Sequence, residues 1–355
     1  MSSKTDLRNL TQSELVDYVV KLGQPAFRGR QIIAWLYRNG IKDFSQMTDL
    51  AKVFRKVLSE NAFFSSFDDY TTEKSADGCI KFAFKLADGK LIESVLIPEE
   101  DRNTLCISSQ VGCAMGCRFC LTASMGYQRN LEPAEIVNQV LAVRDYLTAH
   151  HGENSKIPLS RITNIVFMGM GEPLNNTENL LKSLDILTEP KGLDMAVRRI
   201  TVSTCGIVPE MHRLGHFMPV NLAISLHAVD NETRNRLMPI NRKYPIEQLL
   251  ETCRTYPIAK RKRIMFEYVM LDGINDSEQE AKILARKLRN IPCKINLLPF
   301  NSCKGLPYKG SSREKMETFQ NILRKAHYSV FIRNSRGSDI SAACGQLAQK
   351  QASKR

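Results

Sequence analysis

Three closely spaced cysteines, Cys113, Cys117 and Cys120, have the spacing that most clearly predicts chemistry in this chain. Three thiolates on one short loop can hold three irons of a four-iron, four-sulfur cluster. The fourth iron then lacks a protein ligand, so it can bind a small chelating molecule and pass it an electron. The CxxxCxxC spacing therefore predicts a [4Fe-4S] cluster with one open iron. That arrangement is typical of enzymes that cleave S-adenosylmethionine (SAM) to a carbon radical.

A structural zinc ion is the alternative interpretation of the same cysteines. Zinc normally takes four ligands, often from CxxC pairs. Cys106 could supply the fourth sulfur, and the protein would then be a zinc-stabilised RNA-binding protein rather than an enzyme. Disulfide bonds are not expected, because the chain carries no sign of export.

The composition is that of a globular protein with a polyanionic partner. The 355 residues are 43% hydrophobic and 25% charged, and the formal net charge is +13. Excess positive charge of this size favours nucleic acid as a partner. Basic runs at 259–263 and 350–355 fit such a role, although each could equally be a solvated surface.

The start of the chain is polar and is followed by no apolar signal-peptide core, and no run approaches the length that spans a bilayer. We therefore expect a cytoplasmic protein without a membrane partner. Ten cysteines in such a chain indicate metal and thiol chemistry.

The elements that must position the cysteines begin with a small helical module at residues 1–65. Thr11 and Glu14 form a capping-box pattern at the start of a first helix. A second helix is expected around 30–38 and a third around 50–60. We interpret this module as an accessory domain that binds RNA.

Residues 66–98 are expected to form a linker and a β-hairpin. Apolar residues alternate on both sides of Asp88-Gly89, a strong turn signal. In the return strand Glu93 shares a face with apolar neighbours. A buried carboxylate there would have a raised pKa and could accept a proton. A glutamate exposed at a sheet edge is the alternative.

Residues 99–345 alternate between strand and helix patterns, and 346–355 form a basic tail. Six β/α repeats predict a parallel sheet curled into a partial (β/α)6 barrel, with a last strand near 330–333. The expected strands are 104–108, 162–168, 199–204, 221–226, 264–270 and 294–299. The expected helices are 133–147, 177–187, 209–216, 246–256, 277–289 and 313–326.

Catalytic groups in such barrels lie at the carboxyl ends of the strands. The CxxxCxxC motif follows the first predicted strand, and polar groups or glycines follow four others. Each could be ordinary loop capping, but four at the same rim favour a binding site. The residues concerned are Gly171, Glu172, Ser203, Ser225, Leu226, His227 and Asn301.

These motifs together resemble those of the radical SAM RNA methyltransferases of the RlmN/Cfr family, and in particular the RlmN group of dual-specificity 23S rRNA and tRNA adenine C2-methyltransferases. The resemblance runs nearly end to end. The segments that carry it are 27–32 with 35–37, 106–113, 169–174, 224–228 and 336–347.

The resemblance implies a residue-by-residue assignment of the site. Cys344 would receive a methyl group from one SAM, and a second SAM would yield the 5′-deoxyadenosyl radical, so that two SAM molecules are used per turnover. Glu93 would accept the proton from adenine C2. Cys106 would resolve a transient protein–RNA crosslink by forming a disulfide with Cys344. Cys113, Cys117 and Cys120 would bind the cluster. SAM would contact Gly171, Glu172, Ser203, Ser225, Leu226, His227 and Asn301.

The implied substrates are adenosine 2503 of 23S rRNA and adenosine 37 of some tRNAs. A Cfr-like enzyme that methylates C8 of the same rRNA adenine is the alternative, but Pro173 matches the C2 group. Ser338 departs from the family pattern, which usually has an acidic residue there. A flavodoxin-like reductant and a monomeric state are also implied. His227 could instead be a structural histidine.

Overall fold

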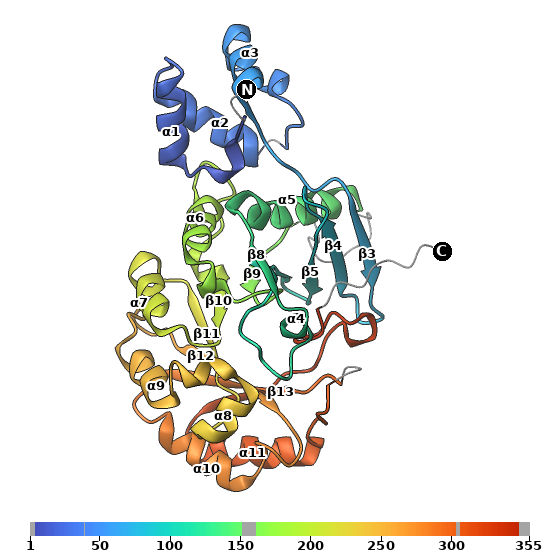
Figure 1. Cartoon of the computed structure of the whole chain (residues 1–355), viewed down its shortest axis with the longest axis vertical. Helices are drawn as coiled ribbons and strands as arrows, with labels where there is room; N and C mark the ends of the chain where they lie inside the picture. The colour runs from blue at the N-terminus through green and yellow to red at the C-terminus, as the bar shows by residue number, and fades with distance from the viewer. Residues whose placement is uncertain (1–3, 39, 151–160, 303–305, 348–355) are drawn as a thin grey trace.

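The computed structural model describes residues 4–38, 40–150, 161–302 and 306–347. Its amino-terminal part is a small helical module at one end of an elongated molecule (Figure 1). Three α-helices form it: α1 (Gln12–Lys21), α2 (Phe27–Tyr37) and α3 (Lys52–Asn61). Thr11 caps α1 and forms the expected capping box with Glu14.

Several polar contacts attach this module to the rest of the chain. Arg8 is 6% exposed and donates from Nη1 to Oδ1 of Asn138 at 3.0 Å. Gln12 and Lys182 add contacts to Glu189 and Glu14. The helical module is therefore docked against α5 (Pro133–Ala149) and α6 (Thr177–Thr188) rather than separated by a linker.

The main sheet of the described chain has ten strands, and its larger part is parallel. The order is β14-β13-β12-β11-β10-β9-β6-β5-β4-β3. The parallel strands are β6 (Asn103–Cys106), β9 (Asn164–Phe167), β10 (Ile200–Thr204), β11 (Asn221–Ser225), β12 (Ile264–Met270), β13 (Cys293–Pro299) and β14 (Ser329–Ile332). This pattern confirms the predicted partial barrel.

Helices follow these strands and cover one side of the sheet (Figure 1). Besides α5 and α6 they are α7 (Val208–Phe217), α8 (Asn231–Leu237), α9 (Ile246–Thr255), α10 (Glu278–Lys287) and α11 (Arg313–Lys325). Each lies within a few residues of the predicted helix, except α8, which was not expected. Apolar side chains of strands and helices form one large buried core.

The antiparallel part of the sheet differs from the expected hairpin in one respect. The hairpin strands β4 (Ile80–Lys85) and β5 (Leu91–Pro98) are present, but β3 (Tyr70–Lys74) adds a third strand in the region interpreted as a linker. Strand β5 also pairs with β6, so the hairpin continues the barrel sheet rather than projecting from it.

The segment after β14 connects the two ends of this sheet. Arg336 donates to the Asp77 carboxylate and to the carbonyl of Pro98, and Asp339 accepts from Ser75 Oγ at 2.6 Å. Ser75 and Asp77 lie in the turn between β3 and β4. Residues 334–347, which we call the closing segment, therefore reach from one sheet edge to the other.

No helix among the described residues is both long and apolar enough to cross a membrane. Cys303 and most of the basic tail, 348–355, lie outside the described residues.

Candidate active site

The three motif cysteines lie on one loop between two short elements. Strand β7 (Gln110–Gly112) precedes Cys113, and α4 (Leu121–Ser124) follows Cys120. The motif therefore follows β7, which pairs with β8 (Tyr127–Asn130), and not β6 directly as expected. Gly112 has φ +74, and a Cβ there would lie 1.8 Å from the carbonyl oxygen of Gly126, so only glycine fits this turn.

The three motif cysteines are suited to bind a cluster because of their number and because neighbouring cysteine charges raise the pKa values of Cys113 and Cys117. None is in a disulfide, and each is partly exposed. Burial raises the pKa of Cys113 to about 12 and that of Cys117 well above its usual value, and neighbouring cysteine charges raise both further. Iron binding would replace those protons. Within the described residues, no three His, Cys, Asp or Glu side chains converge on a single metal-ion position.

Glu172 lies at the carboxyl end of β9 and is 5% exposed. Its two carboxylate oxygens accept hydrogen bonds from the backbone N–H groups of Cys205, at 2.9 Å, and Leu174, at 3.1 Å. Burial raises its pKa. An ammonium group bound beside it would favour the ionised form. Gly171 before it has φ +98, and a Cβ there would clash with Gln110 at 2.5 Å.

Ser225 is the last residue of β11 and Ser203 the last but one of the neighbouring β10, and both are half-buried. The chain after β11 is fixed by backbone contacts, because Leu226 N–H donates to the carbonyl of Glu267 at 3.1 Å. These positions therefore lie at one rim of the sheet, as predicted.

His227 combines a structural contact with a place beside the cluster loop. Its Nδ1 accepts from the backbone N–H of Val269 at 3.0 Å, and Phe119 meets its ring edge-on at a centroid distance of 4.8 Å. Burial lowers its pKa to about 3, so the ring is neutral at physiological pH with its proton on Nε2. His227 therefore has the structural role considered above, through Nδ1, and its Nε2 takes no part in that contact.

Cys344 lies on the closing segment and is exposed at the rim. The carbonyl of Gly345 accepts from Leu121 N–H at 2.8 Å, directly after Cys120, and Asn301 donates to the carbonyl of Cys344 at 3.4 Å. Although the residue as a whole is exposed, its thiol is enclosed by protein atoms; this desolvation, followed by the Glu267 charge, raises its pKa to about 11. The closing segment thus brings Cys344 to the cluster loop and to a predicted SAM position.

Cys106 and Glu93 lie on adjacent strands at the same face. Cys106 pairs with Val95, two residues beyond Glu93, and paired residues of an antiparallel ladder share a face. Burial raises the pKa of Cys106, and the proximity of Cys344 adds to this rise. Glu93 is 3% exposed, so the alternative of an edge-exposed glutamate was wrong.

Three buried charged residues were not predicted as part of this site. Lys81 on β4 is 3% exposed beside Glu93, Glu267 on β12 is 6% exposed near Cys344, and Arg234 on α8 is 0% exposed. Period-2 and period-3.6 patterns treat a charged residue as solvent-facing, and no sequence signal marked these as exceptions.

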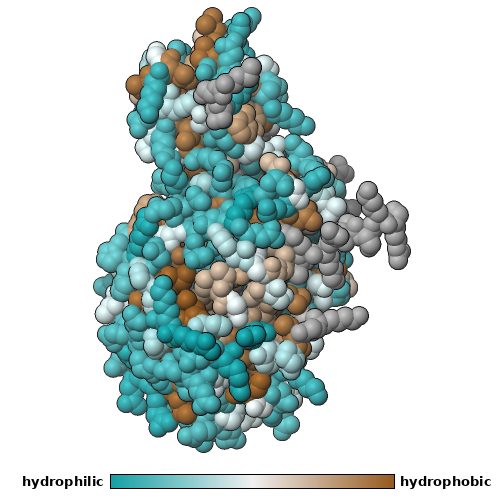
Figure 2. Space-filling model, viewed as in Figure 1, coloured by the Kyte–Doolittle hydropathy of each residue, from teal (hydrophilic) through white to brown (hydrophobic). Residues whose placement is uncertain are grey.

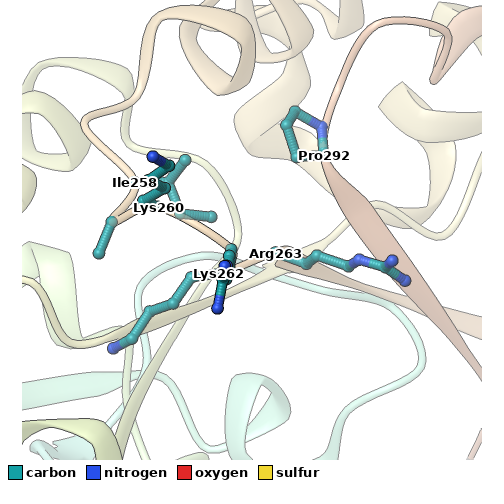
Figure 3. A pocket seen from close by; sticks show the side chains of 7 residues that line it. Ile258, Lys260, Lys262, Arg263 and Pro292 are labelled. Carbon is teal, nitrogen blue, oxygen red and sulfur yellow. The ribbon is translucent and has the colours of Figure 1, made fainter.

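The surface agrees with a site at this rim. Figure 2 shows apolar and weakly polar side chains gathered at the middle of one face, around the region where Figure 1 draws α4, among an otherwise hydrophilic surface. The open hollow of Figure 3 is elsewhere. It is lined by Lys260, Lys262, Arg263 and Pro292, at the amino ends of β12 and β13.

Comparisons with known proteins agree with this geometry. Residues 5–64 match the family model of the ribosomal RNA large subunit methyltransferase N-terminal domain, and residues 107–284 match that of the radical SAM superfamily. A dual-specificity RNA methyltransferase RlmN from Desulfotalea psychrophila is 66% identical over 99% of this chain and 97% of its own length. The chain belongs to the RlmN family.

Other members support the same assignment. An RlmN from Geobacter sulfurreducens is 50% identical over 99% of this chain and 94% of its own length. The crystal structure of a radical SAM methyltransferase from Sphaerobacter thermophilus is 42% identical, has a TM-score of 0.88 and covers 96% of this chain and 98% of its own. Membership of the radical SAM superfamily implies an iron–sulfur cluster and SAM. This membership contradicts the alternative that the protein is a zinc-stabilised RNA-binding protein without enzymatic activity.

Proposed function

We propose that this protein methylates C2 of adenine in RNA, with adenosine 2503 of 23S rRNA and adenosine 37 of some tRNAs as substrates. The observation that carries the proposal is the contact of the closing segment with the cluster loop, where Gly345 accepts from Leu121. In the proposal, this contact keeps Cys344 beside the place where the radical would form. The names of its relatives as dual-specificity RNA methyltransferases support an RNA substrate.

In this proposal the bound cluster supplies the electron that splits SAM into methionine and a 5′-deoxyadenosyl radical. Cys113, Cys117 and Cys120 would hold it and would leave one iron without a protein ligand, free to bind SAM. Glu172, fixed by two backbone N–H groups, would accept from the SAM ammonium. Gly171, Ser203, Ser225, Leu226, His227 and Asn301 would form the remaining wall of the SAM site.

Cys344 is the proposed methyl carrier. Its thiolate displaces the methyl group of a first SAM, so a C–S bond forms and S-adenosylhomocysteine leaves. After the radical from a second SAM removes a hydrogen atom from that methyl group, the resulting carbon bonds to adenine C2. Adenine C2 lies between two ring nitrogens and is electron-poor, which is why a carbon radical is needed there.

Glu93 and Cys106 complete the reaction in this proposal. The adduct returns the one electron that the cluster would have supplied for SAM cleavage, and Glu93 takes the C2 proton. The Cys106 thiolate then attacks the sulfur of Cys344, so that the S–S bond forms while the S–C bond breaks. The electron pair of that bond stays on carbon, which gains a proton to become the methyl group. An external reductant must restore both thiols, and a flavodoxin-like protein is our expectation for the electron donor.

Anaerobic cluster reconstitution followed by RNA methylation tests the proposal. Mass spectrometry of digested 23S rRNA and tRNA should find 2-methyladenosine, with 5′-deoxyadenosine released. Finding 8-methyladenosine would assign the protein to the C8 alternative. Finding no methylated base with a loaded cluster and a strong reductant would contradict both. We expect the active form to be a cytoplasmic monomer.

A further inference from the structure

The guanidinium of Arg234 on α8 is 0% exposed and lies behind the rim of the sheet. It donates to three backbone carbonyls at the ends of two strands. These are Cys205 at 2.7 Å, after β10, and Ser225 at 3.1 Å and Leu226 at 3.1 Å, at the end of β11. A fourth contact, at 3.0 Å, goes to Oδ1 of Asn241. One side chain thus fixes two of the strand ends that form the proposed SAM site.

All four acceptors of Arg234 are neutral. Among the described residues no carboxylate forms an ion pair with it, although buried charges are normally paired because desolvation is costly. Burial lowers its pKa, but guanidinium groups remain protonated in proteins. The negative charges of Cys205, Cys117 and Cys253 oppose this fall in the Arg234 pKa.

The cluster loop packs against the helix that carries Arg234. Arg118 N–H donates to the carbonyl of Leu237 at 2.9 Å. Leu237 and Met238 form an apolar cluster with Met115, Cys117 and Phe119 of that loop. Arg234, one turn before Leu237, therefore lies between the strand ends and the loop, where its charge acts on Cys117.

We propose that Arg234 is a positioning residue that serves the cluster in two ways. It supplies a positive charge beside Cys117 that partly offsets the negative charge of the cluster and its thiolates, and it holds the ends of β10 and β11 in place for SAM. This inference rests on the superfamily's cofactor and does not depend on which adenine carbon is methylated. A nearby positive charge stabilises the more negative, reduced form of a cluster, so Arg234 raises the reduction potential.

The experiment compares Arg234→Gln and Arg234→Lys with the exposed Arg236→Gln on the same helix as the matched control. Each full-length protein is reconstituted anaerobically. Iron and sulfide contents are then measured, an EPR-monitored titration gives the midpoint potential, and calorimetry without RNA gives the Kd for SAM. None of these readouts needs methyl transfer, so a failure of the C2 assignment would not affect them.

We expect Arg234→Gln to lower the midpoint potential and to weaken SAM binding about tenfold, since it loses both charge and carbonyl contacts. Arg234→Lys should retain the potential but bind SAM weakly, because an ammonium lacks the planar fork that reaches several carbonyls. Arg236→Gln should match the unchanged protein. A loaded Arg234→Gln with unchanged potential and unchanged Kd would overturn the proposal. If Arg234→Gln does not fold, Arg234→Lys still tests both roles. A lowered midpoint potential in Arg234→Lys would overturn the charge role. An unchanged Kd for SAM in Arg234→Lys would overturn the positioning role.

Discussion

Lys81 Nζ lies 3.8 Å from Oε1 of Glu93, and both side chains are almost fully buried. The same ammonium donates to the carbonyl of Ile340, at 2.7 Å, on the closing segment. Lys81 therefore joins the proposed proton acceptor to the segment that carries Cys344. The exposed carboxylate of Glu73 forms a second ion pair with Lys81, with its Oε1 3.2 Å from Nζ.

Lys81→Met should slow the resolution of the protein–RNA crosslink by at least about tenfold. Removing one partner of a buried pair leaves the other without its counter-charge, which favours the neutral form of Glu93. A neutral carboxyl cannot take the C2 proton. Rapid-quench experiments that follow the crosslinked species on denaturing gels measure this step.

Lys81→Arg is the control, because it keeps the positive charge. It should recover most of the rate. Equal crosslink lifetimes in Lys81→Met and the unchanged protein would show that Glu93 works without this cation.

Cys106→Ala should accumulate a crosslink between protein and RNA that survives denaturation. The thiol that would attack the Cys344 sulfur is then missing, while methyl transfer to Cys344 remains possible. Cys344→Ala should give neither crosslink nor methylated RNA. Denaturing gels with labelled RNA distinguish the two, and free, fully methylated RNA from Cys106→Ala would contradict the resolving role.

Methylation of Cys344 by SAM should accelerate with pH. Its pKa is raised to about 11 by burial and by Glu267, so the thiol is mostly protonated at pH 7. Below the pKa the thiolate fraction rises about tenfold for each pH unit. Over the two units from pH 7 to 9 the rate should therefore rise by somewhat less than about hundredfold, since Glu267, with a pKa of about 7, becomes charged in the same range.

Intact-protein mass spectrometry of single-turnover reactions measures this methylation. Glu267→Gln removes the charge that raises the Cys344 pKa, and it should increase the rate at pH 8. A rate that stays constant from pH 7 to 9 would mean that another group deprotonates the thiol first.

Gly112→Ala should destabilise the protein and reduce iron loading. It combines a positive φ with a Cβ placed 1.8 Å from a carbonyl oxygen, so the cluster loop must shift. The cost should be at least about 2 kcal/mol. Gly89→Ala is the matched control, because Gly89 has φ +80 but no atom within 4 Å of the added Cβ. It should cost only about 1 kcal/mol and retain full iron content. Chemical denaturation and iron analysis check both variants.

The barrel could be predicted from sequence because its helices and strands carry regular apolar patterns with clear ends. Strand β3 could not, since Thr71 to Lys74 are exposed and give no apolar alternation. Helix α8 is short and polar, and its cap at Asp230 resembles an ordinary turn.

The sequence could indicate site residues where chemistry requires fixed residue types at fixed spacing, as for the three motif cysteines, whose role as cluster ligands stays a prediction. The positions of Lys81 and Arg234 could not be predicted, because their burial is decided by segments distant in sequence. Lys81 is covered by contacts that include Ile340, and Arg234 by carbonyls of two separate strands. Periodicity within one element cannot report such contacts.

In the proposed reaction, methyl transfer requires that the closing segment has already folded against the turn between β3 and β4. Its anchors, Asp77 and Ser75, lie in the turn between β3 and β4, the first two strands of the main sheet along the chain, whereas Cys344 belongs to the last part of the described chain. A chain clipped after β14 would retain the three proposed cluster ligands and the whole parallel sheet, yet would lack Cys344, the proposed nucleophile. Such a fragment could consume SAM without modifying any nucleic acid.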